Sequence, residues 1–228
     1  MCLFIHMLML LDIAITGGVN LRPNFSPGVV GGSIMKHVCL IYAHPNPNSF
    51  NRAIRDKVLE YLGSKNISYT LRDLYALGFD PVLSSKDFES LLAGKVPEDI
   101  AREQEIIKGS QLLIFIYPIW WTGMPAILKG YIDRVFSYGF AYEERDGELV
   151  GLLSDKRVII INTLGASEED YRPSGMEECL KKTTDVGIFK FCGMQVIKHI
   201  FLYSIPYVSD EERRSMLEGI IKELEVVL

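Results

Sequence analysis

The sequence has little that would point to nucleic acid, a membrane or a metal. Its 228 residues include 24 Lys or Arg and 29 Asp or Glu, for a net charge of −5, and the basic residues form no cluster. A basic surface for nucleic acid or anionic lipid is therefore not expected. No apolar run reaches the about 20 residues that a transmembrane helix needs.

Cysteines and nucleotide-binding motifs are equally sparse. Cys2, Cys39, Cys179 and Cys192 form no Cys-x-x-Cys pair and have no metal-like spacing with histidine. The simplest interpretation is a reduced, cytoplasmic protein without a metal site. The glycine fingerprint of a Rossmann dinucleotide site and the Walker A sequence of nucleoside-triphosphate enzymes are both missing, so neither class is supported.

Residues 1–34 differ in character from the remainder. Residues 3–11 are apolar but lack the preceding positive charge of a signal peptide. A stretch rich in Gly, Pro, Asn and Ser follows and ends at Gly31-Gly32-Ser33. We interpret residues 1–34 as an N-terminal extension, for which an over-extended gene start, an ordered arm and a cleaved leader are all open. The folded domain is placed at residues 35–228.

From residue 37 onward, strand and helix patterns alternate. Apolar runs predict strands at residues 37–43, 67–71, 112–116, 156–162 and 195–202. Helices are predicted at 50–62, 97–108 and 126–136, then from Pro173-Ser174, and last from the capping box of Ser209 and Glu212. Gly63 is expected to end the first helix and Asp146-Gly147 to form a hairpin turn. Segment 75–96 is too long for a plain connection and should pack over a neighbour or shape a site.

This alternation is typical of an α/β protein in which helices cover both faces of a parallel sheet. Right-handed crossovers leave few strand orders. We predict a flavodoxin-like three-layer sandwich with a five-stranded parallel sheet of order 2-1-3-4-5. In that order the loops after strands one, three and four meet at one edge.

The first of these loops opens a helix, and the free N–H groups of a helix start bind phosphate. His44 and Ser49 add donors, although Ser49 could serve only as an N-cap and His44 as an ordinary loop residue. The second loop carries Trp120 and Trp121, which could form an aromatic wall or a core pair. The third, around Gly165, lets backbone N–H groups approach a ligand. Together the three loops suit flavin mononucleotide (FMN) better than any other common ligand.

Several stretches resemble the NAD(P)H:quinone oxidoreductase family of flavodoxin-like flavoproteins. They are Ile41-Tyr42-Ala43-His44-Pro45, Ser49-Phe50-Asn51, the run from Pro118 to Val135 that contains Trp120-Trp121, and Gly139-Phe140-Ala141-Tyr142. The resemblance covers residue 36 to about residue 205. It implies a homodimer with one flavin per subunit at the interface. It also implies two-electron, ping-pong hydride transfer from NAD(P)H through the flavin to a quinone or similar flat acceptor.

The resemblance further implies a role for residues of each loop. The residues expected around the flavin phosphate and ribityl chain are His44, Ser49, Phe50 and Asn51. Those expected along the isoalloxazine are Pro118, Ile119, Trp120 and Trp121, and those at its pyrimidine edge are Thr163, Leu164 and Gly165. Tyr171 matches a family tyrosine near flavin O2 and is the predicted catalytic residue.

The sequence departs from the family at one position and leaves several functions open. The animal members have a His after this Tyr, and residues 172–180 contain none. Arg172 could supply positive charge instead, or could be a solvated loop residue. Azo- or nitro-compound reduction, a regulatory oxidoreductase subunit of a membrane potassium-efflux system and a one-electron carrier are alternatives. FMN is favoured over FAD because the chain is short and no adenine-binding element is evident. The acceptor and the choice between NADH and NADPH are not determined.

Overall fold

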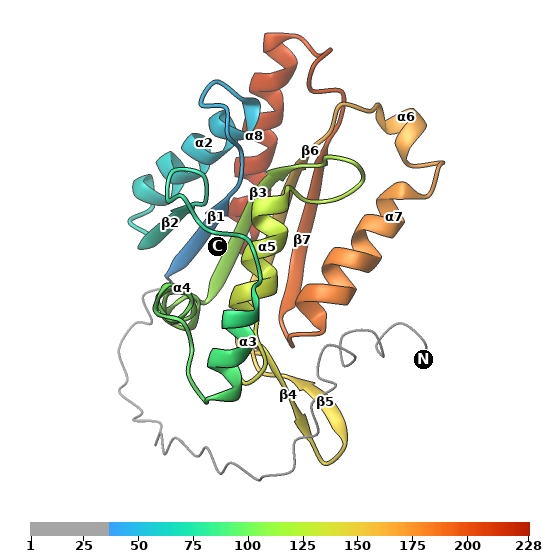
Figure 1. The fold of residues 1–228 in the computed structure, drawn as a ribbon. Helices are drawn as coiled ribbons and strands as arrows, with labels where there is room; N and C mark the ends of the chain where they lie inside the picture. Colours follow the sequence, from blue (N-terminus) through green and yellow to red (C-terminus); the bar gives the residue numbers. More distant parts are fainter. Residues whose placement is uncertain (1–36) are drawn as a thin grey trace. The chain divides into compact units, whose positions relative to one another are not determined.

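The computed structural model describes residues 37–228, so the interpretation of residues 1–34 lies outside the described residues. Its centre is a five-stranded parallel sheet of order β2-β1-β3-β6-β7 (Figure 1). The strands are β1 (Val38–Tyr42), β2 (Tyr69–Asp73), β3 (Leu112–Pro118), β6 (Arg157–Thr163) and β7 (Gln195–Leu202). Counted within this sheet alone, the order is the predicted 2-1-3-4-5, and the fold prediction is confirmed.

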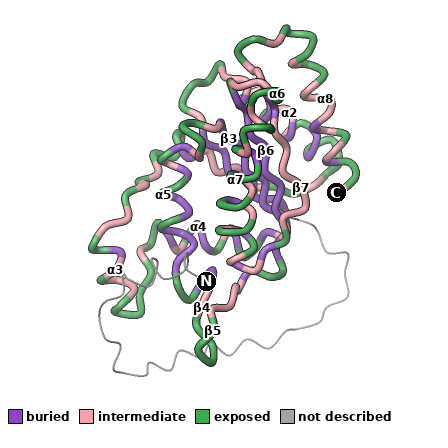
Figure 2. The backbone as a smooth tube through the Cα atoms, turned by 90° about the vertical axis from the view of Figure 1, so that its right-hand side faces the viewer, coloured by how far each residue is buried: buried purple, intermediate pink, exposed green. Residues whose placement is uncertain are grey.

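Helices cover both faces of the sheet and create two buried apolar clusters. On one face lie α2 (Phe50–Ser64) and α8 (Asp210–Val227). On the other lie α4 (Glu98–Gly109), α5 (Ala126–Val135) and α7 (Met176–Lys181), which continues into the π-helix η2 (Lys182–Lys190). Figure 2 shows buried backbone concentrated in the strands and exposed backbone along the outer helices. Because helices cover both sides, β1, β3 and β6 are continuous apolar runs rather than alternating ones.

The strand register brings the carboxyl ends of the central strands to one level. Tyr42 pairs with Ile116, and Pro118 pairs with Thr163. The loops after β1, β3 and β6 therefore leave the sheet at the same edge, which is the upper edge in Figure 1. In a doubly wound sheet this edge is where ligands bind.

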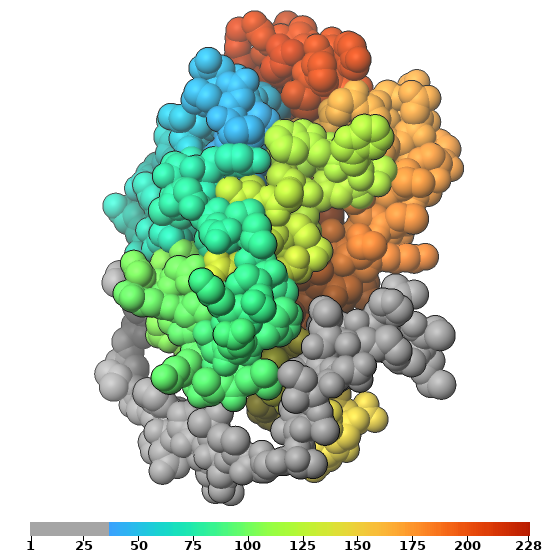
Figure 3. Space-filling model, viewed as in Figure 1, coloured from blue at the N-terminus to red at the C-terminus, as the bar shows by residue number. Residues whose placement is uncertain are grey.

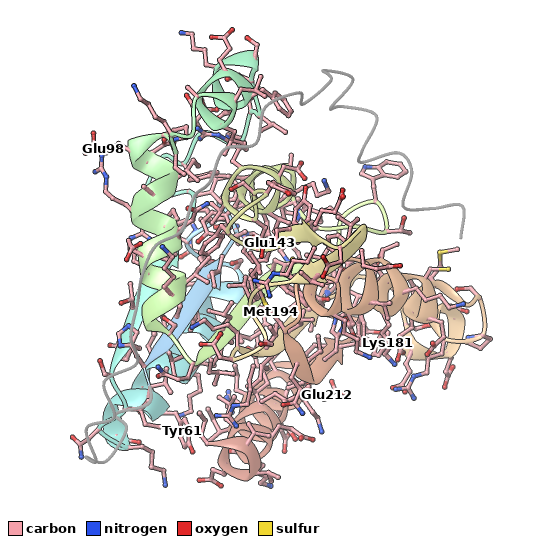
Figure 4. All side chains as sticks on the ribbon, turned by 90° about the horizontal axis from the view of Figure 1, so that it is seen from below. Tyr61, Glu98, Glu143, Lys181, Met194 and Glu212 are labelled. Atoms are coloured by element: carbon pink, nitrogen blue, oxygen red, sulfur yellow. The ribbon has the colours of Figure 1, made fainter. Side chains whose placement is uncertain are left out.

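A β-hairpin lies at the opposite end of the sheet. Strands β4 (Tyr142–Arg145) and β5 (Glu148–Gly151) are antiparallel and are joined by Asp146 and Gly147, with φ of 53° and 81°. The predicted hairpin turn is thereby confirmed. Figure 4 views the molecule from this end and labels Glu143 on the hairpin, with the buried Met194 near the middle of the view.

The segment between β2 and α4 packs against α5 and includes the short helix α3 (Ser85–Leu92). Arg134 of α5 has a side chain only 7% exposed, and its hydrogen bonds hold this segment against α5. Its guanidinium donates to Asp87 (2.9 Å), to Asp99 (2.8 Å) and to the carbonyl oxygen of Asp80 (2.9 Å). The expected packing over a neighbour is therefore observed.

Three local expectations were wrong. Helix α2 runs through Gly63 to Ser64, because the left-handed residue that ends it is Asn66, with φ of 53°. Strand β2 begins two residues late, since it is an edge strand with a less buried pattern. The helix expected from Pro173 begins at Met176, and a separate short helix, α6 (Glu168–Tyr171), precedes it.

Among residues 37–228, no helix combines the length and apolarity needed to cross a membrane.

Candidate functional site

The first loop presents donors at the start of α2. Ser49 is the N-cap, and its Oγ accepts the Arg52 amide at 3.2 Å. The Phe50 and Asn51 amides donate to no group within residues 37–228, as is usual at a helix start. His44 Nδ1 accepts the Asn46 amide at 3.0 Å, so Nε2 carries the ring proton. Burial lowers the pKa of His44, which therefore acts as a neutral donor near neutral pH.

Asn51 joins the first loop to the third. Its side chain is almost fully buried, and Nδ2 donates to Thr163 Oγ1 at 2.7 Å. Its Oδ1 atom is buried and has no hydrogen-bond partner among residues 37–228. A buried carbonyl left unpaired costs about 1–3 kcal/mol. This atom therefore marks a position where a ligand donor would be favourable.

The second loop connects to both of its neighbours. The Ile119 amide donates to the Thr163 carbonyl oxygen at 2.9 Å. The Trp120 ring meets the His44 ring edge-on, with 5.6 Å between their centroids. Three loops that are far apart in sequence are thus held together by specific contacts.

The tip of the second loop has an unusual backbone. Trp120 and Gly123 exchange both backbone hydrogen bonds, at 2.9 and 3.0 Å. Between them, Trp121 and Thr122 both have left-handed φ, 49° and 56°. This arrangement is typical of a type I′ hairpin turn, which normally selects Asn and Gly. The Trp121 side chain is fully exposed, at 101%. Of the two alternatives predicted for Trp120 and Trp121, the structure therefore excludes the buried core pair.

The third loop offers a free donor at Gly165 and leads to Tyr171. The Leu164 amide donates to the Leu202 carbonyl oxygen at 2.8 Å and is not available to a ligand. The Gly165 amide donates to no group in the described part of the chain. The Tyr171 hydroxyl, on α6, is buried and has no hydrogen-bond partner in the part of the chain that the structure describes, and burial raises the pKa of this tyrosine.

A carboxylate that the sequence did not single out organises the region behind Tyr171. Glu177 accepts from Arg172 at 2.8 Å, from Lys181 at 2.5 Å and from the Tyr203 hydroxyl. Burial by itself would raise the pKa of Glu177, but these bonds outweigh it and hold the pKa at about 2. Arg172 also pairs with Glu168 at 2.5 Å. Its charge is therefore balanced by two carboxylates, which does not favour the hypothesis that it replaces the family His.

The predicted site residues divide into those in mutual contact and those apart. The contacts unite His44, Asn51, Ile119, Trp120 and Thr163. Tyr171 instead meets the Tyr203 ring, with 6.3 Å between centroids. Figure 3 shows the yellow-green loop after β3 between the blue region of α2 and the light orange α6 segment. The sequence alternation that starts in β7 and continues one residue past its end has aromatic rings at positions 199, 201 and 203, and these rings stack in succession. This alternation was the signal that could have found Tyr203.

Comparison with known proteins agrees with this architecture. The family described as the flavodoxin-like fold matches residues 36–224. An NAD(P)H oxidoreductase of Haemophilus influenzae is 37% identical over 81% of this chain and 91% of its own length. NAD(P)H dehydrogenase [quinone] 1 of Cavia porcellus is 34% identical over 84% of this chain and 77% of its own. The structure of NAD(P)H:quinone oxidoreductase from Methanothermobacter marburgensis has 30% identity and a TM-score of 0.73, covering 82% of this chain and 96% of that one. The chain therefore belongs to the flavodoxin-like fold family.

Proposed function

We propose that this protein is a flavin-dependent NAD(P)H:quinone oxidoreductase that uses FMN. The observation that carries the proposal is the junction at Thr163, where all three loops meet and Asn51 leaves a buried acceptor unpaired. Relatives with 30% identity or more are named as NAD(P)H oxidoreductases and quinone dehydrogenases.

The residues present fit a flavin by the chemistry of their donors and acceptors. Unpartnered amides at Phe50 and Asn51 suit a phosphate, which prefers the positive end of a helix. The unpaired Asn51 Oδ1 suits a hydroxyl of the ribityl chain. The unpartnered Gly165 amide and the Tyr171 hydroxyl suit the polar pyrimidine edge. Each region of the ligand thus corresponds to a group that is unsatisfied without it.

When bound, the flavin would supply the redox chemistry of two-electron transfer between NAD(P)H and a quinone. The protein contributes binding and electrostatics. Trp120 and Trp121 border the ring system and restrict the occupant of the site to flat molecules. The Gly165 amide and Tyr171 hydroxyl are donors at the end where negative charge develops, and fixed donors are worth more there than water. Because burial raises the pKa of Tyr171, its hydroxyl keeps its proton near neutral pH.

We infer that residues 35–228 form the functional unit, since the family match starts at residue 36 and each proposed site residue follows it. A cytoplasmic location fits the free cysteines Cys39, Cys179 and Cys192. FMN is preferred to FAD because no adenine-binding element is apparent in the sequence. The functional unit would act as a homodimer. The fully exposed Trp121 and the 42% exposed Trp120 stand at the edge of the site, where a second copy would cover them.

An anaerobic titration tests the activity. The protein loaded with FMN is titrated with NADH and separately with NADPH while the flavin absorbance is followed, and a quinone is then added. We expect bleaching in a single two-electron step that the quinone reverses. A protein that takes up FMN but that neither nicotinamide bleaches would favour the carrier or regulatory function. A protein that takes up neither FMN nor FAD would refute the proposal. Replacing the quinone by an azo dye compares the two acceptor classes.

A further inference from the structure

A buried histidine on β7 lies below the proposed site. The His199 side chain is only 4% exposed, and both of its ring nitrogens meet oxygen atoms. Nδ1 is 2.8 Å from Asp185 Oδ1 of the π-helix η2, and Nε2 is 2.7 Å from Asn162 Oδ1 of β6. The ring also stacks on Phe201, with centroids 4.1 Å apart and planes at 22°. His199 therefore bridges the π-helix and the strand that ends in Thr163.

The hydrogen-bond geometry fixes where the protons are. Asn162 Nδ2 donates to the Tyr117 carbonyl oxygen at 3.1 Å, so Asn162 Oδ1 must be the atom that faces the ring. Nε2 therefore has to donate a proton. Asp185 offers a second acceptor to Nδ1. Both ring nitrogens thus face acceptors, and the ring satisfies both contacts only when both nitrogens carry protons.

His37 provides an internal contrast at the other side of the sheet. Its ring nitrogens are 2.8 Å from Ser68 Oγ and 2.9 Å from Thr70 Oγ1. A hydroxyl can donate or accept, so a neutral imidazole satisfies both contacts. Only one of these two histidines therefore needs the additional proton for its hydrogen bonds.

His199 is one residue away from the junction of the three loops, through its contact with Asn162. Asn162 is completely buried and directly precedes Thr163. Thr163 accepts from Asn51 through its hydroxyl (2.7 Å) and from the Ile119 amide through its carbonyl oxygen (2.9 Å). The Asn162 side chain also donates to the carbonyl oxygen of Tyr117, near the end of β3. Because one imidazole fixes Asn162 from below, it sets the position of the strand end that carries Thr163.

Other polar groups around His199 are few within residues 37–228. Asp185 faces it from η2, and Lys181 of α7 lies over the Phe201 ring at 5.7 Å. Lys181 is itself paired with Glu177. The Tyr117 hydroxyl of β3 bonds to Asn162 and Thr184, and burial raises its pKa, so it stays neutral. Asp185 is thus the one carboxylate in contact with the ring.

We propose that His199 is a positioning residue for the flavin, and that proton loss from its ring weakens flavin binding. The proposal rests on the proposed function. When the pH rises, one proton leaves the ring for solvent, and a nitrogen lone pair then faces the oxygen of Asn162 or Asp185. One of the two buried bonds is lost, Asn162 is no longer held, and the backbone at 163–165 loses its fixed position.

The first test measures FMN affinity against pH by quenching of flavin fluorescence, from about pH 6 to about pH 9. His199→Gln keeps an amide donor for Asn162 but does not titrate. His37→Gln is the matched control. We expect the affinity of the native protein to fall about tenfold more than that of His199→Gln over this range, consistent with one lost buried bond. His37→Gln should follow the native protein. His44 and the FMN phosphate titrate in all three proteins, so their contributions cancel. Identical pH profiles for the native protein and His199→Gln would overturn the proposal.

A second test needs neither a variant nor flavin, and so separates this proposal from the proposed function. The ring nitrogens of His199 are observed by ¹⁵N NMR in the ligand-free native protein, together with the amides of Thr163, Leu164 and Gly165. We expect the three amides to shift with the same pH midpoint as the ring nitrogens. Amides that do not follow the ring would overturn the proposal even if FMN binds. If FMN does not bind but the ring and amides behave as expected, the proposed function fails, and what remains is that His199 positions the backbone at 163–165.

Discussion

Replacing Asn51 by Ala should separate ligand binding from folding. In the ligand-free protein the change removes the 2.7 Å bond to Thr163, worth about 1 kcal/mol, but also removes an unpaired buried oxygen that costs about 1–3 kcal/mol. The two effects nearly cancel, so the free energy of unfolding should change by less than about 1 kcal/mol. FMN affinity should nevertheless fall about tenfold or more, since the ligand loses its buried acceptor.

The two quantities are measured separately. Denaturant unfolding of the ligand-free protein gives the stability change, and quenching of flavin fluorescence gives the dissociation constant. Asn48→Ala, an exposed residue of the same loop, is the matched control and should change neither. The reasoning is refuted if Asn51→Ala loses more than about 2 kcal/mol of stability while FMN affinity is unchanged, because Asn51 Oδ1 would then have no role in binding.

Three further predictions concern stability and assembly. Arg134→Met strands the buried Asp87 carboxylate, so the melting temperature should drop by about 10 °C; calorimetry should find partial recovery when Asp87→Asn is added, and no drop would contradict the buried pair. The lowered pKa of Glu177 stabilises the fold above its ordinary value of 4.5, and this contribution is lost as the pH falls toward about 2. Thermal unfolding should therefore show a smaller acid loss in Glu177→Gln than in the native protein, and equal losses would count against the cluster. Trp121→Ala should raise the dimer dissociation constant at least about tenfold in sedimentation experiments, since aromatic residues dominate interfaces; an unchanged constant would exclude Trp121 from the interface.

The central strands β1, β3 and β6 were predictable because they are buried on both faces and are continuous apolar runs. Edge strand β7 was predicted with its observed bounds, and the capping box of Ser209 and Glu212 begins α8 as expected. Edge strand β2 was misplaced because its last two residues, Arg72 and Asp73, are charged and lie outside the apolar run. The loop residues His44, Asn51 and Trp120 could be found because the fold order brings their loops together.

The residues that sequence reasoning missed depend on side-chain contacts across elements. His199 meets Asp185 of the π-helix η2, and local sequence has no marker for that geometry. Glu177 looked like one more acidic residue in a charged helix. It becomes a centre only when Arg172 and Tyr203 converge on it. His199 is a polar residue in a mostly apolar strand. Because a buried polar group needs a hydrogen-bond partner, its position alone indicated that a partner lies nearby.

Trp121 and Thr122 both have a left-handed backbone, and the residues that would stabilise this turn differ from those that the proposed site needs. For residues other than glycine, this backbone costs roughly 1–2 kcal/mol per residue. Asn and Gly at these two positions would relieve much of that cost, and a screen for heat resistance would favour them. The same exchange would delete the exposed indole from the border of the site. In variants selected for heat resistance, positions 121 and 122 should therefore be among the first to change. Such a change would raise the melting temperature and remove the aromatic border of the site.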